Sequence, residues 1–106
     1  MEEKFRNAFK NLMIVVIENE DVEMAAKLLD LDDGLYANDE GAFEDDDYEF
    51  LFYLAVKSGN LDMVKLFRTG IDDVSEALVG MFEYDNTLKD TLDTKILKYL
   101  SRQSMS

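Results

Sequence analysis

Histidine and cysteine, the side chains that most often carry catalysis or hold zinc, are both missing from the sequence. Their absence removes the commonest general base, the thiol nucleophile and the usual zinc ligands. The sequence also lacks a glycine-rich phosphate-binding loop and the nucleophile elbow of hydrolases. Paired carboxylates could perform acid–base chemistry, but among 24 Asp and Glu residues such pairs arise by abundance alone. We therefore predict no catalytic residue, no cofactor and no metal, and hence a protein that is not an enzyme.

The segment Asp30-Leu31-Asp32-Asp33-Gly34 is similar to the opening of an EF-hand calcium loop. Such a loop needs a glycine at its sixth position and oxygen ligands at its first and third positions. With Gly34 at position six, the first and third positions would be Leu29 and Leu31, whose side chains offer no oxygen. The register argues against a calcium loop of this kind.

Carboxylates dominate the middle of the chain, where residues 30–47 contain no Lys or Arg. We expect a long acidic loop over this range, because glycines and Asn interrupt any helical pattern. One interpretation is a solvated loop that keeps the protein soluble and monomeric. The other is a surface whose carboxylates imitate nucleic-acid phosphates and occupy a basic groove on another protein. The second interpretation predicts these partner-binding carboxylates: Asp32, Asp33, Asp39, Glu40, Glu44, Asp45, Asp46 and Asp47.

Aromatic residues crowd the end of this acidic segment and the residues that follow it. If Leu51 and Leu54 face the core, Phe52 points elsewhere. With Phe43 and Tyr48 it could then form an exposed anchor inside an acidic rim. The alternative is that these rings pack in the core or between helices, as large apolar side chains usually do. We include Phe43, Tyr48 and Phe52 among the predicted partner-binding residues.

A formal net charge of −13 on 106 residues indicates the class of partner. Nucleic-acid binding needs clustered Lys and Arg, and anionic membranes repel such a chain, so we expect neither as a direct partner. A protein with a basic surface is favoured instead, with fast association that weakens as salt is added. Small, acidic, cysteine-free proteins of this composition resemble phage or mobile-element inhibitors that block restriction or CRISPR nucleases.

Apolar residues recur at helical spacing through most of the chain, and no proline interrupts them. Asp21, Asn60 and Asp72 or Asp73 are suited to cap helix starts, and Gly59 can adopt a left-handed conformation between two helices. The expected helices span about 2–18, 22–29, 48–58, 61–67, 74–82 and 87–102, and residues 103–106 are expected to form a frayed tail. We therefore predict one all-α domain over residues 1–106, with about six helices in antiparallel hairpins.

The hairpin over residues 48–70 resembles a known family. Its second helix, Leu61-Asp62-Met63-Val64-Lys65-Leu66-Phe67, is similar to the second helix of an ankyrin repeat, and Leu54-Ala55 fits the end of the first. Phe50-Leu51-Phe52-Tyr53 replaces the Thr-Pro-Leu-His opening of an ankyrin repeat, and no clear β-hairpin finger follows. Residues 12–24 also match residues 51–63 at an offset of 39 positions. The resemblance implies stacked, degenerate ankyrin-like hairpins.

These features together predict a non-enzymatic protein-interaction module that binds a partner with a basic surface, for example as an inhibitor. The alternative is a nucleic-acid mimic of the anti-restriction or anti-CRISPR type, which would block the DNA- or RNA-binding groove of a nuclease. The longest apolar run, residues 12–17, is too short to span a membrane. The lack of cysteine and of a signal-peptide pattern leads us to expect a cytoplasmic protein.

Overall fold

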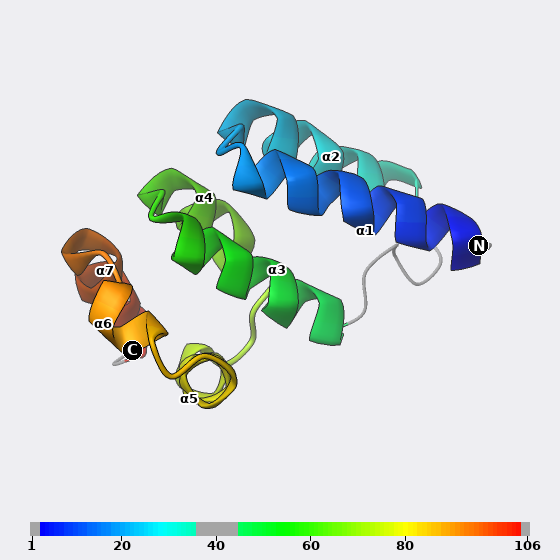
Figure 1. The fold of residues 1–106 in the computed structure, drawn as a ribbon. Coiled ribbons are helices and arrows are strands. Elements are labelled where there is room, and N and C mark those ends of the chain that lie inside the picture. Colours follow the sequence, from blue (N-terminus) through cyan, green and yellow to red (C-terminus); the bar gives the residue numbers. More distant parts are fainter. Residues whose placement is uncertain (1–2, 36–44, 105–106) are drawn as a thin grey trace.

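The computed structural model describes residues 3–35 and 45–104, which form seven α-helices and no strand (Figure 1). The predicted all-α architecture is confirmed. Two antiparallel hairpins come first. The first hairpin consists of α1 (Glu3–Glu18) and α2 (Val22–Leu35), and the second hairpin consists of α3 (Asp45–Ser58) and α4 (Leu61–Arg68).

The turns of the two hairpins share an unusual backbone geometry at positions 39 residues apart. Gly59 in the second hairpin has a φ of 78°, and Glu20 in the first has a φ of 56°. Glycine adopts this left-handed conformation without a Cβ penalty, whereas a glutamate there is strained. The left-handed geometry predicted for Gly59 is confirmed, and the first hairpin makes the same turn with a less favourable residue.

The residue after each left-handed position caps the helix that follows. Asn60 Oδ1 accepts a hydrogen bond from the Met63 N–H at 3.2 Å, and Asp21 Oδ1 accepts one from the Met24 N–H at 3.1 Å. Each bond satisfies a backbone N–H that the first turn of a helix leaves without an intrahelical partner. Both predicted caps are confirmed, and the 39-residue repeat of the sequence is also a repeat of structure.

The two hairpins stack so that equivalent helices lie side by side (Figure 1). α1 packs against α3, and α2 packs against α4. Helices this short are marginal in water on their own, so each hairpin is stabilised by burying an apolar stripe against its neighbour. The fully buried side chains of the two hairpins include Met13, Ile17, Leu51, Phe52, Val56, Met63, Val64 and Phe67.

Three further helices, α5 (Val74–Tyr84), α6 (Leu88–Thr91) and α7 (Thr94–Ser104), complete the described fold. α5 contacts α6 and α7, and α7 also contacts α4, so this group closes the end of the stack away from the first hairpin (Figure 1). Asp73 Oδ1 accepts the Glu76 N–H at 3.1 Å, which confirms the predicted cap of α5. Leu88, Ile96 and Leu100 are fully buried and hold the last two helices in place.

The predicted single helix over residues 87–102 is wrong, because the chain breaks between α6 and α7. Leu92 has an extended backbone with a ψ of 130°, and Asp93 Oδ1 accepts the Lys95 N–H at 2.8 Å. A carboxylate that bonds a nearby backbone N–H offers the chain an alternative to a continuous helix. Asp93 therefore ends one helix region and starts the next, which raises the number of helices in the described residues from six to seven.

The predicted acidic loop over residues 30–47 is also too long, because both of its ends are helical. α2 continues to Leu35 and includes Gly34, whose cost inside a helix is only about 1 kcal/mol and does not stop it. α3 begins at Asp45, and carboxylates in a first turn are favoured by the positive end of the helix dipole. Only residues 36–44 of the predicted loop fall outside these helices, and they lie outside the described residues.

Candidate protein-binding surface

The predicted acidic surface is described only in part. Asp39, Glu40, Phe43 and Glu44 lie outside the described residues. Four other predicted residues have helical backbones, with side chains that the structure does not describe: Asp32, Asp33, Asp45 and Asp46. Asp32 and Asp33 are in α2, whereas Asp45 and Asp46 open α3, so the carboxylates are divided between the two hairpins.

Asp47 is the predicted carboxylate whose side chain the structure describes, and it contacts the first hairpin. Its Oδ1 forms an ion pair with Lys10 Nζ at 3.0 Å, and both side chains are partly buried. The pair connects the first turn of α3 to α1, so Asp47 helps to hold the two hairpins together. A partner-binding role for Asp47 would have to compete with this internal contact.

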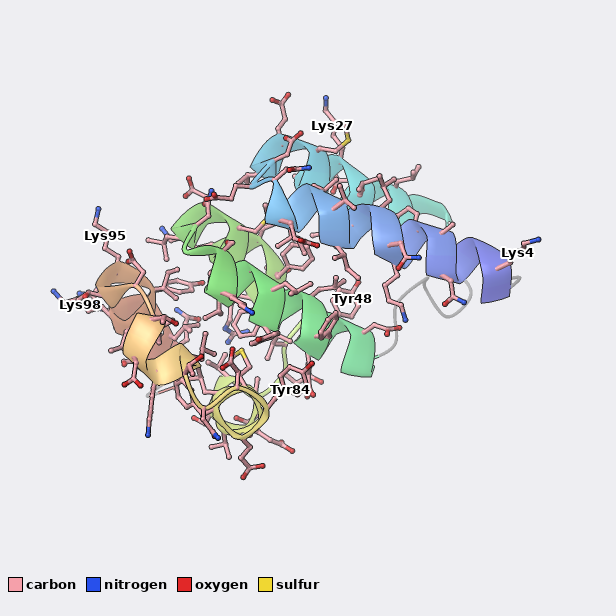
Figure 2. All side chains as sticks on the ribbon, in the orientation of Figure 1. Lys4, Lys27, Tyr48, Tyr84, Lys95 and Lys98 are labelled. Carbon is pink, nitrogen blue, oxygen red and sulfur yellow. The ribbon has the colours of Figure 1, made fainter. Side chains whose placement is uncertain are left out.

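The two aromatic residues predicted at the start of the second hairpin both pack inward. Phe52 is fully buried in the core, so the prediction that it forms an exposed anchor is wrong. Its position in α3 faces the other helices, because α3 lies at the centre of the stack and contacts both α1 and α4. Tyr48 is half-buried, and its ring lies against Gly70, where an added Cβ would come within 2.7 Å of Tyr48 Cδ1. Figure 2 shows Tyr48 on α3.

An open groove runs between α3 and α5 and has a volume of about 250 Å³. We call it the α3–α5 groove. Its lining residues are Glu49, Phe50 and Tyr53 from α3 and Ala77, Gly80, Met81 and Tyr84 from α5. Gly80 has open space where a Cβ would stand, so the missing side chain leaves room in the groove. The groove is mostly apolar, with one carboxylate at its edge.

Three aromatic rings form a continuous row along this groove. The Tyr53 and Tyr84 rings meet edge to face with centroids 5.3 Å apart, and the Phe50 and Tyr53 rings lie 6.2 Å apart at a tilt of 35°. Tyr84 is 73% exposed and Phe50 is 39% exposed, whereas Tyr53 is buried between them. Large exposed aromatic side chains of this kind are typical of sites that anchor a protein partner. Figure 2 shows Tyr84 on α5.

Tyr53 is fixed in place by a hydrogen bond across the α3–α5 boundary. Its hydroxyl donates to Asp85 Oδ2 at 2.8 Å, and Thr87 Oγ1 donates to Asp85 Oδ1 at 2.7 Å. Burial raises the pKa of the Tyr53 phenol, and the bond to Asp85 raises it further. The bonds from Thr87 and Tyr53 lower the pKa of Asp85. A neutral phenol therefore faces an ionised carboxylate, which stabilises the ring position.

Tyr53 also contacts a cation. Lys57 Nζ, one turn further along α3, lies 5.8 Å from the centroid of the Tyr53 ring. The electron-rich face of a tyrosine attracts ammonium and guanidinium groups at this distance. The Tyr53 ring therefore already contacts a cation of its own chain, which also helps to fix its position.

A second, smaller pocket of about 150 Å³ adjoins the groove and is acidic. Glu49 lines both cavities. Asp72 and Asp73 from the link between α4 and α5, with Glu76 from the first turn of α5, complete the acidic set. Arg68 Nη1 donates to the Ile71 carbonyl at 2.8 Å on this link. Within the described residues no group of three or more potential ligands is arranged to hold a metal ion. These carboxylates form an acidic rim at one end of the aromatic row.

The main residues of this groove are absent from the partner-binding residues predicted from the sequence, although the sequence carries a signal for them. The apolar stripe of the fifth helix, Val74, Ala77 and Met81, continues at helical spacing to Tyr84, which lies just past the end of the helix predicted over 74–82. Phe50 falls at the same spacing before Tyr53. Including Phe50 in the stripe of the third helix and Tyr84 in the stripe of the fifth would have indicated this surface. The Tyr53–Asp85 contact joins residues 32 positions apart and has no local signal.

Comparisons with family models, curated proteins and solved structures found no match to this chain. The ankyrin-like relationship therefore stays a prediction, carried by residues 48–70 and by the 39-residue structural repeat. No helix in the described part of the chain combines the length and apolar character needed to cross a membrane.

Proposed function

We propose that this chain is a protein-interaction module that binds a basic segment of a partner protein along the α3–α5 groove. The observation that carries the proposal is the row of Phe50, Tyr53 and Tyr84, with two of its three rings exposed to solvent. Exposed tyrosines supply a large contact area with little loss of conformational freedom, and they are enriched among residues that dominate binding energy. A groove of this kind offers binding without any reactive group.

The charge around the groove supports a basic partner. Glu49, Asp72, Asp73 and Glu76 gather at one end of the aromatic row, in a chain whose net charge is −13. Lys or Arg side chains of a partner could pair with these carboxylates while their neighbours contact the rings. Long-range attraction would accelerate the encounter and make it sensitive to salt. The predicted carboxylates Asp39, Glu40 and Glu44 contribute to the same net charge.

The nucleic-acid mimic is the second candidate, and the net charge alone favours it. A phosphate mimic acts through carboxylates spread along a surface, and it has no need of an apolar groove. The α3–α5 groove therefore favours the interaction module over the mimic. The two functions differ in one measurement, because only a mimic must be displaced from its target by DNA or RNA.

Two variants test the groove without disturbing the core. Tyr84→Ala removes the most exposed ring, and we expect it to weaken partner binding by about tenfold or more. Gly80→Leu fills the groove from α5, where space is open, and leucine suits a helix better than glycine. Val79→Ala is the matched control, because Val79 is exposed on α5 and does not line the groove.

The measurement is capture of basic proteins from cells of the source organism at low and high salt. Captured proteins would be identified by mass spectrometry, purified and remeasured by calorimetry with each variant. We expect wild type and Val79→Ala to bind alike, Tyr84→Ala and Gly80→Leu to bind weakly, and salt to weaken every complex. Equal affinity of all four proteins would contradict partner binding at the groove. Displacement of the partner by DNA, with unchanged affinity of Tyr84→Ala and Gly80→Leu, would favour the mimic.

A further inference from the structure

The first hairpin carries an apolar face that nothing in the described structure covers. Its members are Leu12 and Val15 on α1, which are 49% and 52% exposed, and Met24 and Leu31 on α2, which are 42% and 47% exposed. We call these four residues the outer face. Single exposed apolar residues are ordinary, but four on one side of one hairpin form a patch that favours association.

On α1, the outer face lies on the flank that points away from the second hairpin. Lys10 reaches Asp47 of α3, and Ile14 lines a cavity shared with α3, so these two residues mark the flank that faces α3. Helical spacing places Leu12 and Val15 on the other flank, across the buried stripe.

The same holds on α2. Ala26 and Leu29 line a cavity together with Leu66 of α4, which marks the flank of α2 that faces α4. Met24 and Leu31 fall on the other flank by helical spacing. Both helices of the first hairpin thus present apolar residues on the side opposite to the second hairpin.

The 39-residue repeat shows what kind of element covers such a face. Leu51 and Met63 are the equivalents of Leu12 and Met24, and both are fully buried. In stacked hairpins, the flank of the second hairpin that faces the first corresponds to the outer flank of the first hairpin. The outer face is therefore a repeat interface without its neighbour, and a pair of helices is the element that fits it.

The charges on the outer face indicate which pair of helices would cover it. The stripe along the outer flank of α1 contains no carboxylate, although the chain has a net charge of −13. Its residues are Lys4, Ala8, Leu12, Val15 and Asn19. On α2, Lys27 stands between Met24 and Leu31, and its Nζ lies 3.6 Å from Glu23. Figure 2 shows Lys27 projecting from α2 away from the second hairpin. A basic partner finds few carboxylates to pair with here. A second copy can bring the same stripe against itself without opposing acidic groups.

We propose that two copies of this chain associate symmetrically through their outer faces. Leu12, Val15, Met24 and Leu31 of one copy pack on the same residues of the other, and the four helices form one apolar layer. The far end of each stack is closed by α5, α6 and α7 and offers no equivalent hairpin flank, so the outer face of a second copy is the surface that matches it and the pair is closed. The remaining surfaces carry net negative charge and repel, so added salt strengthens this association.

Sedimentation velocity over a range of protein concentrations at low and high NaCl tests the proposal. We expect wild type to shift from monomer to dimer with concentration, with a dissociation constant about tenfold lower at high salt. The double variant Val15→Asp/Met24→Asp should raise that constant by about a hundredfold, because it brings four carboxylates into apolar contact. Val79→Asp and Leu97→Asp, at exposed apolar positions on α5 and α7, should behave as wild type.

A disulfide test keeps the proposal open to refutation if the double variant fails to fold, as judged by circular dichroism. The chain has no cysteine, so Leu12→Cys introduces a single thiol, and Val79→Cys is its control. Under mild oxidation we expect Leu12→Cys to form a linked dimer much faster than Val79→Cys. The proposal is overturned by a wild type that stays monomeric at every concentration and salt, by equal linking rates, or by an outer face that links to a different protein instead.

This inference is independent of the proposed function. Partner binding uses the α3–α5 groove and weakens with salt, whereas self-association uses the first hairpin and strengthens with salt. Tyr84→Ala should leave the dimer unchanged, and Val15→Asp/Met24→Asp should leave the groove intact, so either proposal can fail alone.

Discussion

The first and second hairpins make the same turn and lie in different surroundings. Each turn has a left-handed residue followed by a side chain that caps the next helix, at positions 39 residues apart. The second hairpin lies between the first hairpin and α7, and its large apolar residues other than Phe50 are buried or partly buried. Within the described residues the first hairpin has a neighbouring hairpin on one flank, and its outer face is exposed.

This difference shows which properties of a hairpin are local. Turn geometry and caps depend on a few neighbouring residues, so the same pattern gives the same turn in both hairpins. Burial depends on the position in the stack, so equivalent residues have opposite exposure. A leucine at a repeat position therefore contributes to the core in one hairpin and to a possible interface in the other.

The largest expected effect distinguishes the two equivalent leucines, Leu51 and Leu12. Leu51→Ala should lower the free energy of unfolding by about 2–5 kcal/mol, because it leaves a cavity in a closed core. Leu12→Ala should change the free energy of the monomer by no more than about 0.5 kcal/mol. Urea unfolding at low protein concentration, where the monomer dominates, measures both, and equal costs would show that the stacking differs from the one described.

The second prediction reverses the residues at the left-handed positions. Gly59→Ala should destabilise by about 1 kcal/mol through backbone strain alone, since no atom lies within 4 Å of the added Cβ. Glu20→Gly should stabilise by about 0.5–1 kcal/mol, because it removes the same strain from the first hairpin. Thermal melts of the two variants should shift in opposite directions, and a shared direction would break the equivalence of the turns.

The smallest effects concern pH at the boundary between the second hairpin and α5. The pKa of Asp85 is lowered in the folded state by the bonds from Thr87 and Tyr53, so its contribution to stability is present above the unfolded pKa, about 3.9. That contribution is lost as the pH falls through the folded pKa. Asp85→Asn should flatten the acid limb of the stability profile measured by urea unfolding.

Tyr53 gives a pH dependence of stability opposite in sign to that of Asp85. Burial and the bond to Asp85 raise its pKa, so its contribution is complete below the unfolded pKa of about 10 and is lost as the pH rises through the folded pKa. Tyr53→Phe should flatten the alkaline limb. An unchanged profile in both variants would mean that the hydrogen bond does not form in solution.

The features predicted correctly from the sequence are those with a local cause. Asp21, Asn60 and Asp73 were expected as caps and Gly59 as a left-handed turn, because each depends on the residues beside it. The helical stripes also located all but one of the helices. Helix ends were less predictable: opposing propensities of about 1 kcal/mol decided whether α2 continued past Gly34.

The features that were missed depend on contacts between distant segments. Phe52 was predicted to be exposed because its neighbours Leu51 and Leu54 were assigned to the core. A central helix such as α3 is buried on several sides, so Phe52 is buried as well. The α3–α5 groove exists only because α5 returns across α3, and the row of Phe50, Tyr53 and Tyr84 joins two helices. A pattern along one helix does not contain that information.

Gly70 shows how a missing side chain guides the chain from the second hairpin to α5. Its equivalent in the first hairpin is Leu31, so the repeat changes character at this position. A methyl group at residue 70 would come within 2.7 Å of the Tyr48 ring, and either the ring or the chain leading to α5 would have to move. The hydrogen atom that takes the place of that methyl group lets the chain leading to α5 pass directly against α3 at Tyr48. The segment that starts one wall of the α3–α5 groove is thus placed by the absence of a single side chain.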